Sequence, residues 1–129
     1  MRKLYLLTPM ILFLGCEERF EVYTQGKENT SKINCLRYDV GEKLEKDMML
    51  KALKFQDDPT CEYSINLTKY HVKSCNNPQT KSLGADFDGY IRVEILKNAE
   101  TIYKAQSDFK SDEIGAFKRV LSKTSEELK

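Results

Sequence analysis

The sequence predicts an α+β domain in which two amphipathic helices cover one face of a three- to four-stranded, mostly antiparallel sheet. In several stretches apolar and polar residues alternate with a period of two, which is typical of strands with one buried face. In two other stretches apolar residues recur at spacings of three and four, the period of a helix. The expected order is strand, helix, strand, strand, strand, helix. If both helices pack on one face of the sheet, the apolar faces of the helices and of the strands are buried against each other.

The first half of the domain supplies one strand and one helix, and then a second strand. Residues 33–40 alternate as a strand, and residues 42–55 follow with the helical period. Pro59 ends the helical region, because proline disfavours helical geometry in the residue before it. Residues 62–72 alternate again, but the apolar phase shifts after Leu67, which predicts a β-bulge near residues 68–69.

The second half predicts a hairpin and a terminal helix. Residues 87–97 carry the clearest alternation, and residues 101–109 run back after a tight connection. Residues 112–128 have an apolar stripe at helical spacing, with Ser111 as the expected N-cap. An immunoglobulin-like β-sandwich is the alternative fold, because the alternating stretches are numerous and residues 20–24 add one more.

Charge and size limit the classes of function. The chain has 129 residues, with 21 Lys and Arg against 20 Asp and Glu, and the two signs are interspersed. A nucleic-acid-binding domain would show a basic patch or a strongly basic composition. One domain of ordinary size is expected, with a core large enough to fold without a cofactor.

The first sixteen residues have the layout of a secretory signal. Arg2 and Lys3 precede an apolar run that continues to Leu14, and Gly15 and Cys16 come directly before a charged stretch. The apolar run is shorter than the roughly 20 residues that a membrane-spanning helix needs. The ending Leu-Phe-Leu-Gly-Cys resembles the lipobox of bacterial lipoproteins.

This resemblance implies that the leader is removed and that Cys16 is acylated. The predicted organisation is therefore a cleaved signal peptide at 1–15, a lipidated N-terminus and tether at 16–31, and one globular domain at 32–129. Attached acyl chains such as palmitate would hold the protein on a membrane, since each buried methylene contributes about 0.8 kcal/mol. Glu17, in place of the aspartate that marks inner-membrane retention in this family, favours the outer membrane and its periplasmic side.

The element order behind the lipobox is similar to that of small periplasmic α/β lipoproteins that assist outer-membrane assembly. Examples are the lipopolysaccharide-assembly lipoprotein and the lipoprotein activators of cell-wall synthases. The similarity lies in element order and apolar rhythm between residues 33 and 128. It transfers no individual binding residue to this chain, because fold alone does not determine function.

Three cysteines remain if Cys16 carries lipid, and an exported domain allows one disulfide among them. A continuous strand between Cys61 and Cys75 would hold their ends about 45 Å apart, which favours pairing of Cys35 with one of the other two. If that segment folds back as a hairpin, a Cys61–Cys75 pair becomes feasible.

Catalytic, cofactor-binding and metal-binding residues are not predicted. His71 is the single histidine, and it lies in a predicted strand about 13 Å from Cys75 along an extended chain. None of the common hydrolase, metalloprotease or phosphate-binding motifs is present in the sequence. The sequence therefore favours a non-catalytic protein without a cofactor, with an enzyme that relies on His71 as the weaker hypothesis.

A binding surface is predicted on the sheet face turned away from the helices. Tyr90, Arg92 and Leu96 alternate with the buried residues of their strand, and Ile102 should join them from the next strand. Apolar and aromatic groups among charges are compatible with a protein-binding surface. The predicted function is a lipid-anchored periplasmic module that binds another envelope protein. A surface-exposed lipoprotein adhesin or antigen is the alternative.

Overall fold

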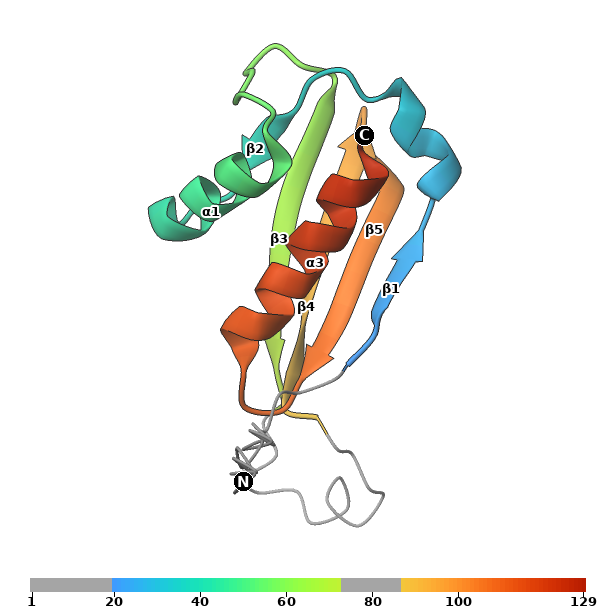
Figure 1. Ribbon diagram of the computed structural model, residues 1–129. Coiled ribbons are helices and arrows are strands. Elements are labelled where there is room, and N and C mark those ends of the chain that lie inside the picture. Colours follow the sequence, from blue (N-terminus) through green and yellow to red (C-terminus); the bar gives the residue numbers. More distant parts are fainter. Residues whose placement is uncertain (1–19, 73–86) are drawn as a thin grey trace, which may run out of the picture.

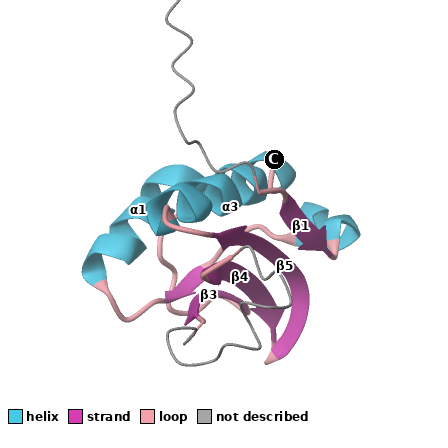
Figure 2. Ribbon diagram, turned by 90° about the horizontal axis from the view of Figure 1, so that it is seen from below, coloured by secondary structure: helices cyan, strands magenta, loops and turns pink. Residues whose placement is uncertain are grey.

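A computed structural model of the 129-residue chain describes residues 20–72 and 87–129. Within these ranges one five-stranded sheet has the strand order β1-β5-β4-β3-β2, and two α-helices pack against one of its faces (Figures 1 and 2). The strands are β1 (Val22–Gln25), β2 (Arg37–Asp39), β3 (Tyr63–His71), β4 (Gly89–Lys97) and β5 (Glu100–Phe109). The helices are α1 (Lys43–Leu53), α3 (Glu113–Glu127) and the short 3-10 helix η1 (Lys27–Lys32). The predicted α+β class is confirmed, and a single sheet covered by helices is not a β-sandwich.

The sheet contains one strand more than the sequence predicts. β1 pairs antiparallel with β5, with Val22 opposite Ser107, and η1 follows it directly. The sheet and η1 therefore include residues that the sequence assigns to the tether at 16–31. A four-residue strand carries too short an alternation to stand out in a sequence, so its place depends on pairing with β5.

The sheet is mixed: three of its strand pairs are antiparallel, as expected, and the pair at the β2 edge is parallel. β2 pairs parallel with β3, with Tyr38 opposite Ile65, and α1 makes the connection between them. Only three residues of the predicted strand 33–40 form β2. Next to it, Asp57 accepts the Tyr38 backbone N–H through Oδ1 at 3.1 Å, and the Lys46 ammonium lies 2.6 Å from Asp57 Oδ2. These two contacts lower the pKa of Asp57 and tie the segment after α1 to β2.

A disulfide links the segments that precede β2 and β3. Cys35, just before β2, is bonded to Cys61, just before β3, with a Cα–Cα distance of 5.9 Å. This is one of the pairings of Cys35 that the sequence favours. Beneath it, Tyr38 is buried and its hydroxyl donates to the Phe55 carbonyl at 2.9 Å. Burial raises the pKa of Tyr38 to about 12.

The predicted bulge in β3 is wrong. The register with β4 runs unbroken from Tyr63 opposite Lys97 to His71 opposite Gly89. Lys69 and His71 therefore continue the face that the helices cover, although they are polar. They are accommodated because acidic residues of both helices lie there: Lys69 pairs with Glu45, and His71 Nε2 lies 2.9 Å from Glu113 Oε2. The apolar pattern of β3 shifts in the sequence because its last residues on the helix side are polar and contact acidic side chains, whereas its first ones are apolar. The irregular register lies instead in the β4–β5 pair, between Ile95 and Leu96.

The core lies between the sheet and the two helices. Ile65, Ile91, Val93 and Ile95 form its centre on the sheet and are fully buried. The buried apolar residues that the helices contribute are Met49 and Leu53 from α1, and Ala116, Phe117, Val120 and Leu121 from α3. The N-cap of α3 is Asp112 rather than Ser111, and its Oδ1 accepts the Gly115 N–H at 2.8 Å. A carboxylate there also suits the positive end of the helix dipole.

The β4–β5 turn carries backbone strain that a substitution can relieve. Asn98 and Ala99 form its tip, with φ of 49° and 69°. The left-handed conformation costs a residue with a Cβ about 1–2 kcal/mol, and glycine largely avoids that cost. Ala99→Gly is expected to raise the free energy of unfolding by about 1 kcal/mol in urea titration. The matched change Ala52→Gly, within α1, should lower it by about 1 kcal/mol. A loss of stability in Ala99→Gly would contradict the turn geometry.

Candidate functional site

The sheet face opposite the helices is named here the open face. Both α-helices lie on the other side of the sheet (Figure 2). Residues directly opposite one another in a ladder share a face, so the registers define the set. It comprises Tyr23 and Gln25; Thr101, Lys104, Gln106 and Asp108; Tyr90, Arg92, Glu94 and Leu96; Ser64, Asn66, Thr68 and Tyr70; and Arg37 and Asp39.

An ordered aromatic and cationic cluster lies on this face near the end of β3 and the start of β4. The Tyr70 and Tyr90 rings are stacked with centroids 5.1 Å apart. The Arg92 guanidinium lies 4.8 Å from the centroid of the Tyr90 ring, and Arg92 Nε donates to Gln106 Oε1 at 2.9 Å. Stacking and a cation–π contact each restrict side-chain rotation. The cluster is thus arranged before any partner arrives, which lowers the entropic cost of binding.

Charges on the open face are largely paired within it. Arg92 lies 3.7 Å from Glu94, and Glu94 also accepts the Thr101 hydroxyl at 3.1 Å. Arg37 lies 3.5 Å from Asp39 at the β2 edge. The face therefore offers aromatic and aliphatic surface among mutually compensated charges, which is the usual composition of a transient protein interface.

Three of the four residues predicted from the sequence lie on the open face: Tyr90, Arg92 and Leu96, all half-buried. Ile102 lies at the irregular register, where Leu96 is opposite Thr101, and it is half-buried and packs against the core. Two further tyrosines were missed. Tyr70 is 47% exposed and Tyr23 is 61% exposed, which makes them the most accessible aromatic groups of this face. The predicted bulge assigned Tyr70 to the helix side of the sheet, and Tyr23 lies in the stretch that was predicted to be a tether.

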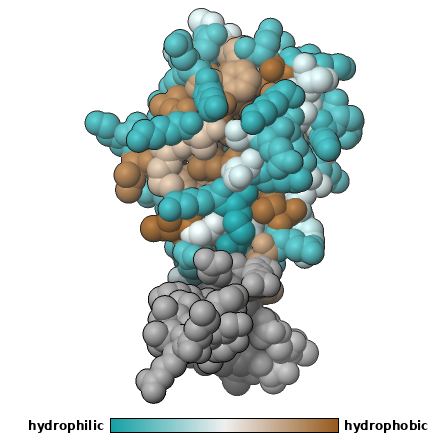
Figure 3. All heavy atoms as spheres, in the orientation of Figure 1, coloured by the Kyte–Doolittle hydropathy of each residue, from teal (hydrophilic) through white to brown (hydrophobic). Residues whose placement is uncertain are grey.

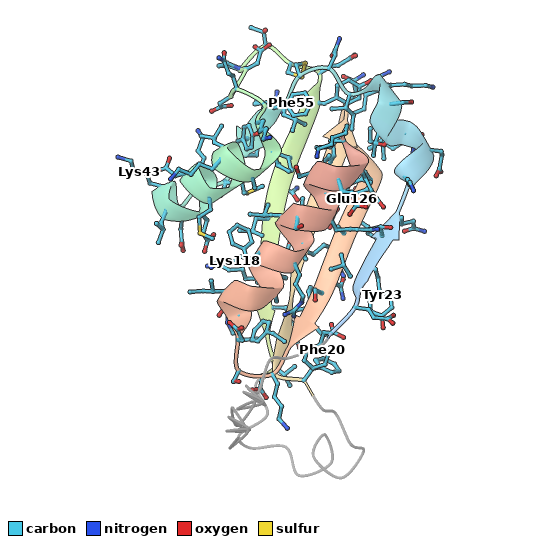
Figure 4. All side chains as sticks on the ribbon, in the orientation of Figure 1. Phe20, Tyr23, Lys43, Phe55, Lys118 and Glu126 are labelled. Atoms are coloured by element: carbon cyan, nitrogen blue, oxygen red, sulfur yellow. A yellow bond between two sulfur atoms is a disulfide. The ribbon has the colours of Figure 1, made fainter. Side chains whose placement is uncertain are left out.

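A groove of about 500 Å³ lies on the helix side, between α1 and α3. Its apolar lining is Met48, Ala52 and Leu121, and its polar rim includes Lys118 and Glu126 of α3 (Figure 4). Apolar atoms are visible in the strip between the two helices, bordered by polar side chains (Figure 3). The groove could accept an apolar group, but it is separate from the open face because the sheet lies between them.

His71 contacts residues of α3 and β5. It faces the helix side, 2.9 Å from Glu113 and with its ring edge against Phe109. Cys35 and Cys61 are bonded to each other, so neither is a free nucleophile while the bond is intact. Cys16 and Cys75 lie outside the described residues. Within residues 20–72 and 87–129, no group of three or more His, Cys, Asp or Glu side chains is arranged to hold a metal ion.

The described helices include none long and apolar enough to cross a membrane. Comparison with other proteins adds no further constraint: no family model, curated protein or solved structure matches this chain.

Proposed function

We propose that this protein is a lipid-anchored, non-catalytic domain of the bacterial envelope that binds another envelope protein through its open face. The observation that supports it most is the ordered Tyr70–Tyr90–Arg92 cluster on a sheet face opposite both helices. Tyrosine and arginine are enriched among residues that contribute most to protein–protein binding. The lipobox-like stretch ending at Cys16 supports the anchor.

The proposed anchor would keep this face close to a membrane. Six residues lead from Cys16 to Val22, the first residue of β1. A chain of that length spans about 20 Å at most when fully extended. With Cys16 acylated, the near end of β1 stays within that distance of the bilayer, so the proposal assigns a partner that is itself in or near the same membrane.

The test is partner capture in intact bacterial cells with variants of the open face. Tyr90→Glu and Leu96→Glu are each expected to reduce the yield of the crosslinked complex by about tenfold. The physical reason is that an unpaired charge placed within a protein interface weakens binding by roughly 1.4 kcal/mol or more. Thermal unfolding of the purified variants should stay close to that of the parent protein, since both side chains reach solvent.

Leu44→Glu is the matched control. Leu44 is 73% exposed on α1, on the helix side, and the substitution introduces the same charge. It is expected to leave the crosslinked complex unchanged. Full retention of the complex by both open-face variants would refute this surface assignment. Protease treatment of whole cells tests the alternative adhesin location, because a periplasmic domain is protected and a surface domain is cut.

A further inference from the structure

The outer edge of β1 is an unprotected sheet edge among the described residues. β1 is the outermost strand on its side, with β5 on its inner flank (Figure 1). Its sequence, Val-Tyr-Thr-Gln, has no charge and no proline. The opposite edge strand, β2, is shorter and carries Arg37 and Asp39. Charges and short length are the usual devices that block strand addition, so β1 is the edge that can accept a strand.

A groove borders β1 on each face of the sheet. The helix-side groove, of about 410 Å³, is lined by Val22 and by Lys118, Arg119, Ser122, Lys123 and Glu126 of α3. The open-face groove, of about 320 Å³, is lined by Tyr23, Thr24, Gln25, Lys104 and Gln106. Figure 4 shows Tyr23 on β1, and Lys118 and Glu126 on α3. Because successive side chains of a strand point to opposite faces, a strand added at β1 would place alternate side chains in the two grooves.

The helix-side groove has an excess of cations. Lys118, Arg119 and Lys123 line it with the carboxylate of Glu126. Lys123 Nζ also lies 3.8 Å from Oε1 of the largely buried Glu127, which leaves three cations against two carboxylates. Arg119 is fixed there, with Nε donating to Ser107 Oγ at 3.2 Å and a second guanidinium nitrogen donating to the Asp108 carbonyl at 3.0 Å. This charge favours acidic side chains in the added strand. It disfavours a second copy of the chain, since edge-to-edge pairing of two copies would bring the same cations toward one another.

We infer that β1 binds an extended acidic segment of a partner protein, which adds a sixth strand to the sheet and places its acidic side chains beside Lys118 and Lys123. The inference rests on the proposed function and specifies the binding mode: main-chain hydrogen bonds to β1 give affinity, and the helix-side groove selects the sequence. Tyr23 and Gln25 make this edge continuous with the open face.

The test uses the full chain in detergent micelles and a fluorescein-labelled peptide of four Glu-Thr repeats. Binding is followed by fluorescence anisotropy and located by hydrogen–deuterium exchange. The peptide is expected to bind and to slow amide exchange in residues 20–26. A peptide of four Lys-Thr repeats, and a Glu-Thr peptide N-methylated at the residues that face β1, should each bind about tenfold more weakly, because the first carries the opposite charge and the second lacks backbone N–H donors.

Charge reversal on the protein sharpens the test. The double variant Lys118→Glu/Lys123→Glu should bind the Lys-Thr peptide in preference to the Glu-Thr peptide. The matched variant Lys43→Glu/Lys54→Glu carries the same charge change on or next to α1, and it should keep the parent preference. Absence of Glu-Thr binding, or slowed exchange elsewhere than β1, overturns the inference. If the peptide does not bind β1 but Tyr90→Glu still reduces partner capture in cells, the inference about β1 fails and the proposed function stands. If the peptide binds β1 but Tyr90→Glu leaves partner capture unaffected, the assignment of the open face fails instead.

Discussion

Removal of the Cys35–Cys61 disulfide is expected to lower the free energy of unfolding by about 3.5 kcal/mol. The two cysteines are 26 residues apart, and the loop between them contains β2 and α1. Without the crosslink, the unfolded chain regains the freedom of that loop, and β2, a three-residue edge strand, loses the tie to β3. The measurement is urea unfolding of Cys35→Ala/Cys61→Ala against the parent protein without reductant.

Reductant supplies the control for this prediction. Dithiothreitol should shift the unfolding midpoint of the parent protein toward that of the double variant. It should leave the double variant unchanged, because that variant has no bond between these positions to reduce. Equal midpoints for the oxidised parent and the double variant would contradict the stabilising role assigned to the crosslink.

Truncation of Ile65 to alanine is expected to cost about 3 kcal/mol of unfolding free energy. Ile65 is fully buried in β3, between Tyr38 of β2 and Ile95 of β4 in the ladder. The change removes apolar surface from the core and leaves a cavity bounded by strands on both sides, which cannot collapse easily. Chemical denaturation monitored by tyrosine fluorescence measures the loss.

Ile114→Ala is the matched comparison, because the same atoms are removed at a position that is 62% exposed near the start of α3. Its expected effect is within about 0.5 kcal/mol of the parent. A similar loss at both positions would mean that the core does not lie between the sheet and the helices.

The long periodic elements could be predicted from sequence because burial on one face repeats over many residues. β4 and β5 alternate over nine and ten residues, and both were expected as strands. The short strands could be predicted only in part, since β2 lies within the strand expected at 33–40 but is much shorter, and β1 lies within the stretch assigned to the tether. β1 and β2 have four and three residues, and each is defined by its neighbour: β1 by antiparallel pairing with β5, and β2 by parallel pairing with β3.

The binding surface was predicted in part for the same reason. Tyr90, Arg92 and Leu96 follow from the regular alternation of β4, whereas the irregular register after Ile95 puts Thr101 and not Ile102 opposite Leu96. The position of Tyr70 on this face could not be predicted, because it depends on Lys69 and His71 lying on the helix side, where they contact acidic residues of α1 and α3. Those contacts join residues 24 and 42 positions apart, so a local pattern does not contain them.

The central proposal, an acylated docking domain, is tested most directly by mass spectrometry of the chain extracted from bacterial membranes. The expected result is a polypeptide that begins at Cys16 and carries the added mass of two or three acyl chains. A chain that retains Met1–Gly15, or one that is released from membranes with an unmodified Cys16, would contradict the proposal.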